Sequence, residues 1–236
     1  ITGGTGTGRG IYCRLASSPT IKNCTITGNH PSTSGGGILL QDSNARFIDC
    51  KITNNEVTFG AGGGIYIEKI NASTPPAPQI TGCLIQGNTA STDGGGIAVF
   101  RSAPVITNCV ISGNTANGYD GGGGVWFNAI PHAEEGGIAA NPSCATGCTG
   151  TTVIRLTNCL VVGNFAPRTD GGPGRGGGLF LSLNDTQSRA EISNCTISGN
   201  TAAGVGDGIY AYRRCFSLTN SILWDDSSGS GSELAL

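Results

Sequence analysis

The chain of 236 residues has few charged side chains, and the two signs nearly balance. It carries 13 Lys and Arg against 15 Asp and Glu, for a net charge of −2, and only 12% of its residues are charged. Binding to nucleic acid depends on clustered Lys and Arg that neutralise phosphates, and this sequence has no such cluster. The composition therefore argues against DNA or RNA as a partner.

Long apolar segments and helical patterns are also missing. No apolar run approaches the length of a membrane-spanning helix and no signal peptide opens the sequence, so we expect no membrane insertion of this segment. Apolar residues do not follow the i, i+3, i+4, i+7 spacing of an amphipathic helix, and 41 residues are glycine, a poor helix former. These absences argue against an α-helical fold.

The sequence does contain a nine-residue motif that recurs along its whole length. One copy is Ile106–Asn114, which reads Ile-Thr-Asn-Cys-Val-Ile-Ser-Gly-Asn. Its fourth position is cysteine in six copies and serine in a seventh: Cys24, Cys50, Cys83, Cys109, Cys159, Cys195 and Ser221. The steps from Cys24 to Cys50 and from Cys83 to Cys109 are both 26 residues. A fixed period of this size indicates a repeat architecture.

A glycine run ending in an aliphatic residue precedes each copy, as in Gly94-Gly95-Gly96-Ile97. Within a unit the apolar residues alternate with period two, which is typical of strands. Short strands stacked unit on unit predict an all-β fold, a single-stranded parallel β-helix (solenoid) of about seven coils of ~26 residues. We expect one domain over residues 1–236, with loop insertions near residues 68–79, 128–152 and 166–176. Both ends fall inside a unit, so we expect a section of a longer solenoid.

An asparagine follows the cysteine position by five residues in six copies: Asn29, Asn55, Asn88, Asn114, Asn164 and Asn200. Stacked coils would bring each amide within hydrogen-bonding reach of its copies about 4.8 Å above and below, which is an asparagine ladder. The alternative is that these residues only form turns, since asparagine tolerates the left-handed conformation. Their fixed offset from the cysteine position favours the ladder.

The ten cysteines fall into different groups. The six at the repeat position share the parity of the inward Ile or Val, so we predict a buried column of free thiols. In-register side chains point the same way, and their sulfurs stay roughly one strand spacing apart, too far for disulfides. Cys13 is predicted to lie in the core, and Cys215 has no assigned role. For Cys144 and Cys148, in the second insertion, we favour a short disulfide; a metal site is the alternative.

Outward-facing aromatic residues form the main candidate binding site. The residue after each inward aliphatic is aromatic in five of seven units, at Tyr12, Tyr66, Trp126, Phe180 and Tyr210. Stacked coils would align them in a row that suits sugar rings or a partner protein. The alternative is that inserted loops cover this face and bury the row. The sequence leaves both interpretations open.

The evidence for a catalytic or metal site is weaker. His132, Glu134 and Glu135 in the second insertion could form a cluster for acid–base catalysis, but a solvated polar loop explains them as well. Calcium needs several converging oxygens, and four aspartates near the glycine runs do not align with one another: Asp93, Asp120, Asp170 and Asp207. We therefore predict no cofactor, no metal and no catalytic residue, with calcium left as an unsupported alternative.

The paired motifs resemble the right-handed parallel β-helix repeats of bacterial surface proteins, the polymorphic outer-membrane proteins and autotransporter-like passengers. Those repeats pair a Gly-Gly-x-Ile element with a Phe-x-x-Asn element. Here the matches include Gly95-Gly96-Ile97 and Ile111–Asn114. This sequence has Ile in place of Phe, and the resemblance does not include its cysteine column. The resemblance implies right-handedness and an extracellular or cell-surface location.

Two functions are expected from these observations. The sequence favours a non-enzymatic scaffold for adhesion or for filament or surface structure, with a host or cell-surface protein as partner and with end-to-end self-association compatible with that role. The alternative is a carbohydrate-binding or polysaccharide-degrading β-helix that uses the aromatic row. The motifs that we associate with such lyases and hydrolases are not visible in the sequence.

Overall fold

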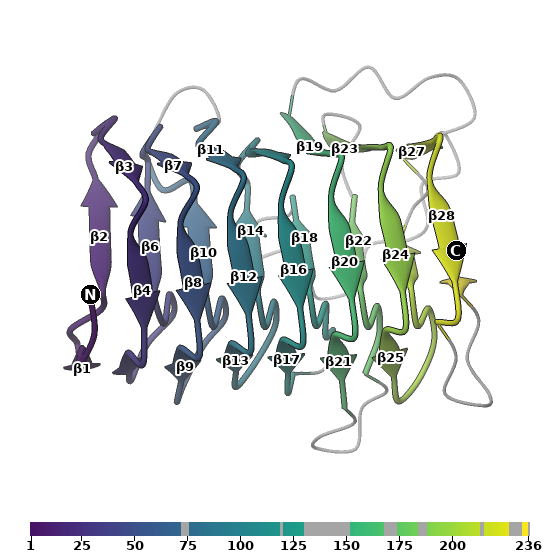
Figure 1. Ribbon diagram of the computed structural model, residues 1–236, viewed down its shortest axis with the longest axis horizontal. Helices are drawn as coiled ribbons and strands as arrows, with labels where there is room; N and C mark the ends of the chain where they lie inside the picture. The colour runs from purple at the N-terminus through teal and green to yellow at the C-terminus, as the bar shows by residue number, and fades with distance from the viewer. Residues whose placement is uncertain are drawn as a thin grey trace.

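The structure is a computed structural model that describes residues 1–71, 76–118, 120–129, 152–167, 174–183, 188–212, 215–226 and 233–235. In these residues the chain winds repeatedly around one axis, and its strands form four long parallel sheets and one two-stranded sheet. Figure 1 shows the axis running horizontally, with the N-terminal coils on the left and the C-terminal coils on the right. The predicted parallel β-helix is therefore confirmed.

The first sheet lies at the back of Figure 1 and contains the strands that follow the glycine runs. Its members are β2 (Ile11–Arg14), β6 (Ile38–Gln41), β10 (Ile65–Glu68), β14 (Ile97–Phe100), β18 (Val125–Asn128), β22 (Leu179–Ser182), β26 (Ile209–Tyr212) and β29 (Leu234–Ala235).

The second sheet lies along the top and contains the strands that precede the cysteine position. Its members are β3 (Thr20–Lys22), β7 (Arg46–Ile48), β11 (Gln79–Thr81), β15 (Val105–Thr107), β19 (Thr152–Thr157), β23 (Ser188–Ser193) and β27 (Phe216–Thr219).

The third sheet faces the viewer and contains the strands that follow the cysteine position. Its members are β4 (Thr25–Thr27), β8 (Lys51–Thr53), β12 (Leu84–Gln86), β16 (Val110–Ser112), β20 (Leu160–Val162), β24 (Thr196–Ser198) and β28 (Ile222–Trp224).

Two-residue strands after the ladder position close the coil along the bottom of Figure 1. They form a fourth sheet of β9 (Glu56–Val57), β13 (Thr89–Ala90), β17 (Thr115–Ala116), β21 (Phe165–Ala166) and β25 (Thr201–Ala202), and a separate pair of β1 (Thr5–Gly6) with β5 (His30–Pro31).

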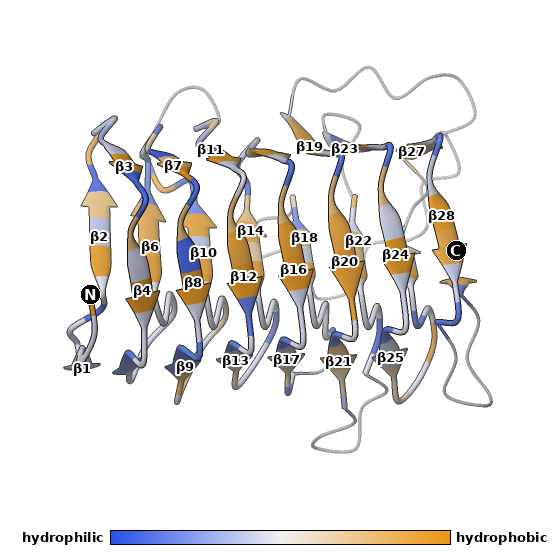
Figure 2. Cartoon of the chain, viewed as in Figure 1, coloured by the Kyte–Doolittle hydropathy of each residue, from blue (hydrophilic) through white to orange (hydrophobic). Residues whose placement is uncertain are grey.

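Equivalent residues of neighbouring coils lie side by side. Ile97 pairs with Ile65 on one side and Val125 on the other, and Ile85 is flanked in the same way by Ile52 and Ile111. Figure 2 shows hydrophobic residues recurring at matching places on β12, β16 and β20. These inward side chains form one continuous core that runs through all the coils. Burying each one contributes about 1.5–3 kcal/mol, so neighbouring coils stabilise one another.

Left-handed residues recur at several corners of the coil. One precedes the cysteine position, as Asn108 does with φ 55°, another precedes the ladder asparagine, as Gly113 does with φ 58°, and another lies in the glycine run, as Gly94 does with φ 67°. None of the ladder asparagines has a positive φ. The alternative that treated them as left-handed turn residues was therefore wrong, because the strained backbone belongs to the residue before each of them.

The glycine runs are needed because consecutive coils approach closely where each run leads into a strand of the first sheet. A β-carbon at Gly96 would lie 2.6 Å from the carbonyl oxygen of Gly124 in the next coil and 3.0 Å from Nδ2 of Asn114. Both neighbours are fixed, one by the backbone and one by the ladder. Only glycine allows the coils to keep their spacing here.

We predict that Gly96→Ala destabilises the protein by about 3 kcal/mol, since the added methyl group must push two coils apart. Gly113→Asn is the control: a β-carbon there meets nothing within 4 Å, and Asn54 occupies the equivalent corner with φ 51°. We expect that variant to stay within about 0.5 kcal/mol of the parent. Urea unfolding followed by circular dichroism measures both. Equal stability of the two variants would contradict the close-approach account.

Candidate functional site

The polar side chains inside the solenoid form an unbroken asparagine ladder. The amide Nδ2 of each asparagine donates to Oδ1 of the next, at 3.0 Å from Asn88 to Asn114 and 2.9 Å from Asn114 to Asn164. The backbone N–H of Asn88 donates to the same Oδ1 of Asn114, at 2.9 Å. The remaining hydrogen of Asn114 Nδ2 goes to the carbonyl of Ile85, at 3.0 Å. All ladder amides are buried, so the predicted ladder is confirmed.

At the N-terminal end of the ladder, a backbone group takes the role of an asparagine. The N–H of Gly4 donates to Oδ1 of Asn29 at 3.0 Å, and Asn29 donates onward to Asn55 at 2.9 Å. Residues 1–4 match the end of the motif and place Gly4 at the ladder position, but glycine has no side-chain amide from which this contact could be predicted. Every member of the ladder therefore has a defined partner on the side toward Gly4.

At the C-terminal end the ladder finishes in a carboxyl group. Asn200 donates to Oδ1 of Asp226 through its backbone N–H at 2.7 Å and through Nδ2 at 2.9 Å. The other oxygen, Oδ2, is buried and has no hydrogen-bond partner. By the register of the other coils, Oδ2 takes the place of an amide nitrogen that would donate to the carbonyl of Ile197. Burial raises the pKa of Asp226, and the charges of Glu233 and Asp207 add to the rise.

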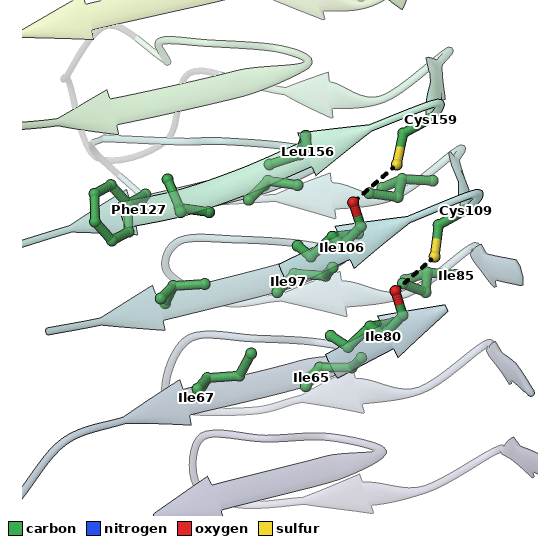
Figure 3. Packing of buried hydrophobic residues seen from close by; sticks show 14 of the residues in the cluster. Ile65, Ile67, Ile80, Ile85, Ile97, Ile106, Cys109, Phe127, Leu156 and Cys159 are labelled. Carbon is green, nitrogen blue, oxygen red and sulfur yellow. Dashed lines mark hydrogen bonds between the residues drawn. The ribbon is translucent and has the colours of Figure 1, made fainter. Parts of the chain in front are cut away.

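The thiol column (Cys24, Cys50, Cys83, Cys109, Cys159 and Cys195) lies at the corner between the second and third sheets, and all its members are free thiols, as predicted. Figure 3 shows Cys109 and Cys159 pointing the same way from adjacent coils. The Cys109 thiol donates to the carbonyls of Thr107 at 3.2 Å and Ile80 at 3.4 Å. Cys159 repeats these two contacts one coil further on, at 3.3 Å and 3.5 Å.

Serine takes over the same position at the end of the thiol column. The backbone N–H of Cys195 donates to Oγ of Ser221 at 3.1 Å, and that hydroxyl donates to the carbonyl of Thr219 at 2.9 Å. Burial raises the pKa of Cys50. Among the central thiols, hydrogen bonding with Cys109 lowers the pKa of Cys83 and of Cys159, and the same contacts raise that of Cys109. The column position accepts a small side chain that donates to a main-chain carbonyl, as Ser221 also does.

The remaining cysteines have separate locations. Cys13 is buried in the core, as predicted, and Cys215, which had no assigned role, is buried there too. Cys144 and Cys148 lie outside the described residues, so their disulfide stays a prediction. So do His132, Glu134 and Glu135, the candidate acid–base cluster.

The aromatic face (Tyr12, Tyr66, Trp126, Phe180 and Tyr210) lies on the outward side of the first sheet. Its pairing is in register, since Trp126 lies opposite Phe180 and Phe180 opposite Tyr210. The Phe180 and Tyr210 rings stack with their centroids 5.2 Å apart, and the guanidinium of Arg175 lies 5.3 Å from the centre of the Tyr210 ring. The predicted alignment of these side chains is therefore present.

Exposure of the aromatic face is uneven. Tyr12 is 46% exposed, whereas Trp126 is 5% and Phe180 3% exposed, and Tyr66 and Tyr210 are partly buried. The sequence left open whether this row is exposed or buried, and its middle members are buried. They pack into a second apolar cluster with Ala98, which occupies the same outward position in its own coil, and with Ala61 and Phe100. The exposed aromatic side chains on this side of the first sheet are therefore Tyr12 and Tyr212. Tyr212 follows Tyr210 by two residues in β26 and is 43% exposed.

Two polar details mark the buried middle of the aromatic face. The indole Nε1 of Trp126 is buried without a hydrogen-bond partner. Burial, helped by the nearby Glu68, raises the pKa of Tyr66, so that phenol stays neutral. The middle of the face is thus an apolar, uncharged packing layer.

The aspartates near the glycine runs contribute to the turns. Asp93 Oδ1 accepts from the N–H of Gly121 at 3.0 Å, and Asp120 lies 3.8 Å from the guanidinium of Arg175. Asp170 lies outside the described residues. Across the described part of the chain, no group of three or more His, Cys, Asp or Glu side chains is arranged to hold a metal ion.

Comparison with known proteins agrees with this geometry. The coils, the parallel register and the internal ladder define a β-helix solenoid. The family model for the right-handed β-helix region matches residues 9–233, so the chain belongs to that family and its coils are right-handed. Searches of curated proteins and of solved structures returned no match. Within the described residues, no helix is long and apolar enough to span a membrane.

We predict that Asn114→Ala lowers the free energy of unfolding by about 3–5 kcal/mol. The change removes the acceptor of two Asn88 donors and the donor to Asn164, and each buried unsatisfied group costs about 1–3 kcal/mol. Asn117→Ala, a nearby asparagine outside the ladder, is the matched control and is expected to change stability by less than about 0.5 kcal/mol. Chemical denaturation distinguishes the two, and a small effect at Asn114 would show that the ladder does not hold the coils together.

We predict that Asp226→Asn stabilises the protein at neutral pH by about 1–3 kcal/mol, because the amide supplies the missing donor. The raised pKa means that the folded state holds the proton to higher pH than the unfolded chain, whose pKa is about 3.9. Stability of the parent therefore falls as pH rises above about 4, and the advantage of the variant shrinks at low pH. Thermal melts from pH 3.5 to pH 8 measure this.

The matched control for this experiment is Asp225→Asn, at the neighbouring exposed corner with φ 58°, a conformation that asparagine also tolerates. We expect that variant to change stability by less than about 0.5 kcal/mol. A constant difference between Asp226→Asn and the parent over the whole pH range would contradict a raised pKa of the Asp226 carboxyl.

Proposed function

We propose that this chain is a section of an extracellular or cell-surface solenoid that acts as a non-enzymatic scaffold for adhesion or for filament or surface structure. The observation that carries the proposal is the continuity of the ladder from Gly4 to Asp226. Each coil is hydrogen-bonded through its interior to the next, and this makes the molecule a stiff rod. Such a rod is suited to holding a contact surface at a distance.

The distribution of polar groups supports a scaffold role. Most buried polar side chains in the described residues belong to the ladder or lie at the corners, where they satisfy the backbone. The thiols of the column are likewise hydrogen-bonded to main-chain carbonyls, as at Cys50, Cys83 and Cys109. Membership of the right-handed β-helix family is compatible with this role, and the resemblance to bacterial surface repeats favours a location outside the cell.

We predict that the purified chain releases no reducing sugar from a panel of acidic and neutral polysaccharides beyond the level given by a heat-denatured sample. The same panel, read by absorbance for unsaturated uronates, tests lyase activity. Release that depends on the folded chain would overturn the non-enzymatic part of the proposal. Antibody labelling of intact source cells tests location, and antigen that becomes reachable only after lysis would overturn the surface assignment.

Carbohydrate binding is a second candidate, favoured by the surroundings of Tyr12. Two guanidinium groups lie near this exposed ring, those of Arg9 at 5.8 Å and Arg14 at 6.0 Å from its centre. An exposed aromatic ring with flanking donors is an arrangement that stacks on a sugar and hydrogen-bonds its hydroxyls. Tyr12→Ala is then expected to weaken binding to a polysaccharide about fivefold, which corresponds to about 1 kcal/mol.

Affinity electrophoresis in polysaccharide-containing gels measures this effect. Phe59→Ala is the control, because Phe59 is an exposed aromatic residue that does not belong to the aromatic face. Equal weakening by both variants would indicate non-specific adsorption, and no binding by the parent would remove this second candidate.

A further inference from the structure

The edge where the first sheet gives way to the second carries exposed aliphatic side chains and cations together. Strands β2, β10 and β14 all run toward this edge, which lies along the top of Figure 1. Arg14 ends β2 and Leu15 follows it, Lys69 and Ile70 follow β10, and Arg101 follows β14. These strands belong to one in-register sheet, so the five residues lie along a line parallel to the solenoid axis, which we call the basic edge.

The backbone of Leu15 adopts a conformation that leucine rarely adopts. Its φ is 58°, in the left-handed region, although its side chain is 72% exposed and gains little from packing. Asp42 occupies the equivalent place one coil further on with φ 49°, and aspartate tolerates this region better than leucine does. Ile70 is the second exposed aliphatic residue of the edge, at 49%. A strained residue that holds a large apolar side chain in solvent points to a partner at this place.

The cations of the basic edge have no acceptor within the protein. In the described part of the chain, no hydrogen bond or ion pair involves the side chain of Arg14, Lys69 or Arg101. The two guanidinium groups only approach aromatic rings, Arg14 at 6.0 Å from the centre of Tyr12 and Arg101 at 5.3 Å from that of Phe100. By contrast, three arginines of the C-terminal half lie 2.8–3.8 Å from a carboxylate: Arg155, Arg175 and Arg189.

The carboxylates nearest the basic edge are already bound to other groups. Asp42 accepts from the backbone N–H of Ile70 at 2.8 Å and from that of Asn71 at 2.9 Å, and it is only 9% exposed. Glu68 accepts from Nε2 of Gln41 and is partly buried. Neither carboxylate forms an ion pair with a cation of the edge, so the edge is suited to an anionic partner.

The exposed aliphatic side chains decide which anionic partner fits. A soluble polyanion, such as an acidic polysaccharide, would satisfy the cations but would leave Leu15 and Ile70 in water. An anionic lipid surface satisfies both, because its phosphates accept from Arg and Lys while apolar side chains enter the boundary between headgroups and acyl chains. Long Arg and Lys side chains can remain at the phosphates while their apolar neighbours reach deeper.

We propose that the basic edge docks this solenoid side-on to an anionic lipid surface, with its two aliphatic side chains in the headgroup boundary and its three cations on lipid phosphates. The edge runs along the axis, so the rod lies parallel to the surface. The contact is peripheral and reversible, because two short aliphatic side chains anchor a protein weakly and need the cations as a second signal. The proposal goes beyond the scaffold role, which does not require lipid.

The first test measures binding of the full chain to lipid vesicles by flotation. We expect binding to vesicles of phosphatidylglycerol and phosphatidylcholine, little binding to phosphatidylcholine alone, and weaker binding as salt is raised. Lys69→Gln is expected to weaken binding about fivefold, which corresponds to about 1 kcal/mol for one cation near an anionic surface. Lys51→Gln is the matched control, because Lys51 is an exposed cation of β8 in the third sheet. No binding by the parent, or equal weakening by the two variants, would overturn the proposal.

Leu15→Asn tests the aliphatic contact separately from folding. Asparagine tolerates the left-handed region, so we expect a variant at least as stable as the parent in urea that binds anionic vesicles about fivefold more weakly. Phe59→Asn is the control, because Phe59 is 74% exposed but lies between β9 and β10, away from the basic edge. Unchanged binding by Leu15→Asn would overturn the proposal. Complete displacement from vesicles by a soluble acidic polysaccharide that binds the parent and Leu15→Asn equally would assign the edge to that polymer and overturn it too.

Discussion

One amide in each coil, placed inside the core, fixes how the whole chain stacks. A buried amide without partners costs several kilocalories per mole, and the ladder position can be satisfied only by the same position in the adjacent coil. A coil displaced by one residue would bring its apolar side chains to the outside and would also leave the amides of two coils unpaired. The ladder therefore specifies the register, and the apolar core supplies most of the stability.

Once the register is fixed, every repeated residue becomes a column. The thiols, the left-handed corners, the glycines of close approach and the aromatic residues are all consequences of one backbone path followed many times. This explains why residues that suggest chemistry in the sequence are mainly structural here. Cysteine serves as a small side chain that donates to carbonyls, and Ser221 performs the same task at the end of the column. The aromatic rings in the middle of their face serve mainly to cover one another.

The repeat made the fold, the asparagine ladder and the thiol column predictable. The period, the parity and the offset from which they were predicted are properties of the sequence itself. Packing outside the core was less predictable. Alternation showed that Trp126 and Phe180 point outward, but it did not reveal that Ala61 and Phe100 pack beside them and close the face. The position of the left-handed residue also stayed open in the sequence, because Gly113 and Asn114 are both plausible turn formers, and the structure places it at Gly113. The ends of the ladder were harder to recognise, because Gly4 lies in an incomplete copy of the motif and Asp226 replaces the asparagine of the seventh copy.

The most direct test of the ladder is hydrogen exchange at the asparagine side chains, followed by NMR. If the ladder holds the coils in register, Nδ2 hydrogens of Asn88, Asn114 and Asn164 will exchange only when the solenoid unfolds, with protection equal to that of the core strand amides. The side-chain amide of Asn117 will exchange at the rate of a free amide. Exchange of the ladder amides as fast as that of Asn117 would contradict the account.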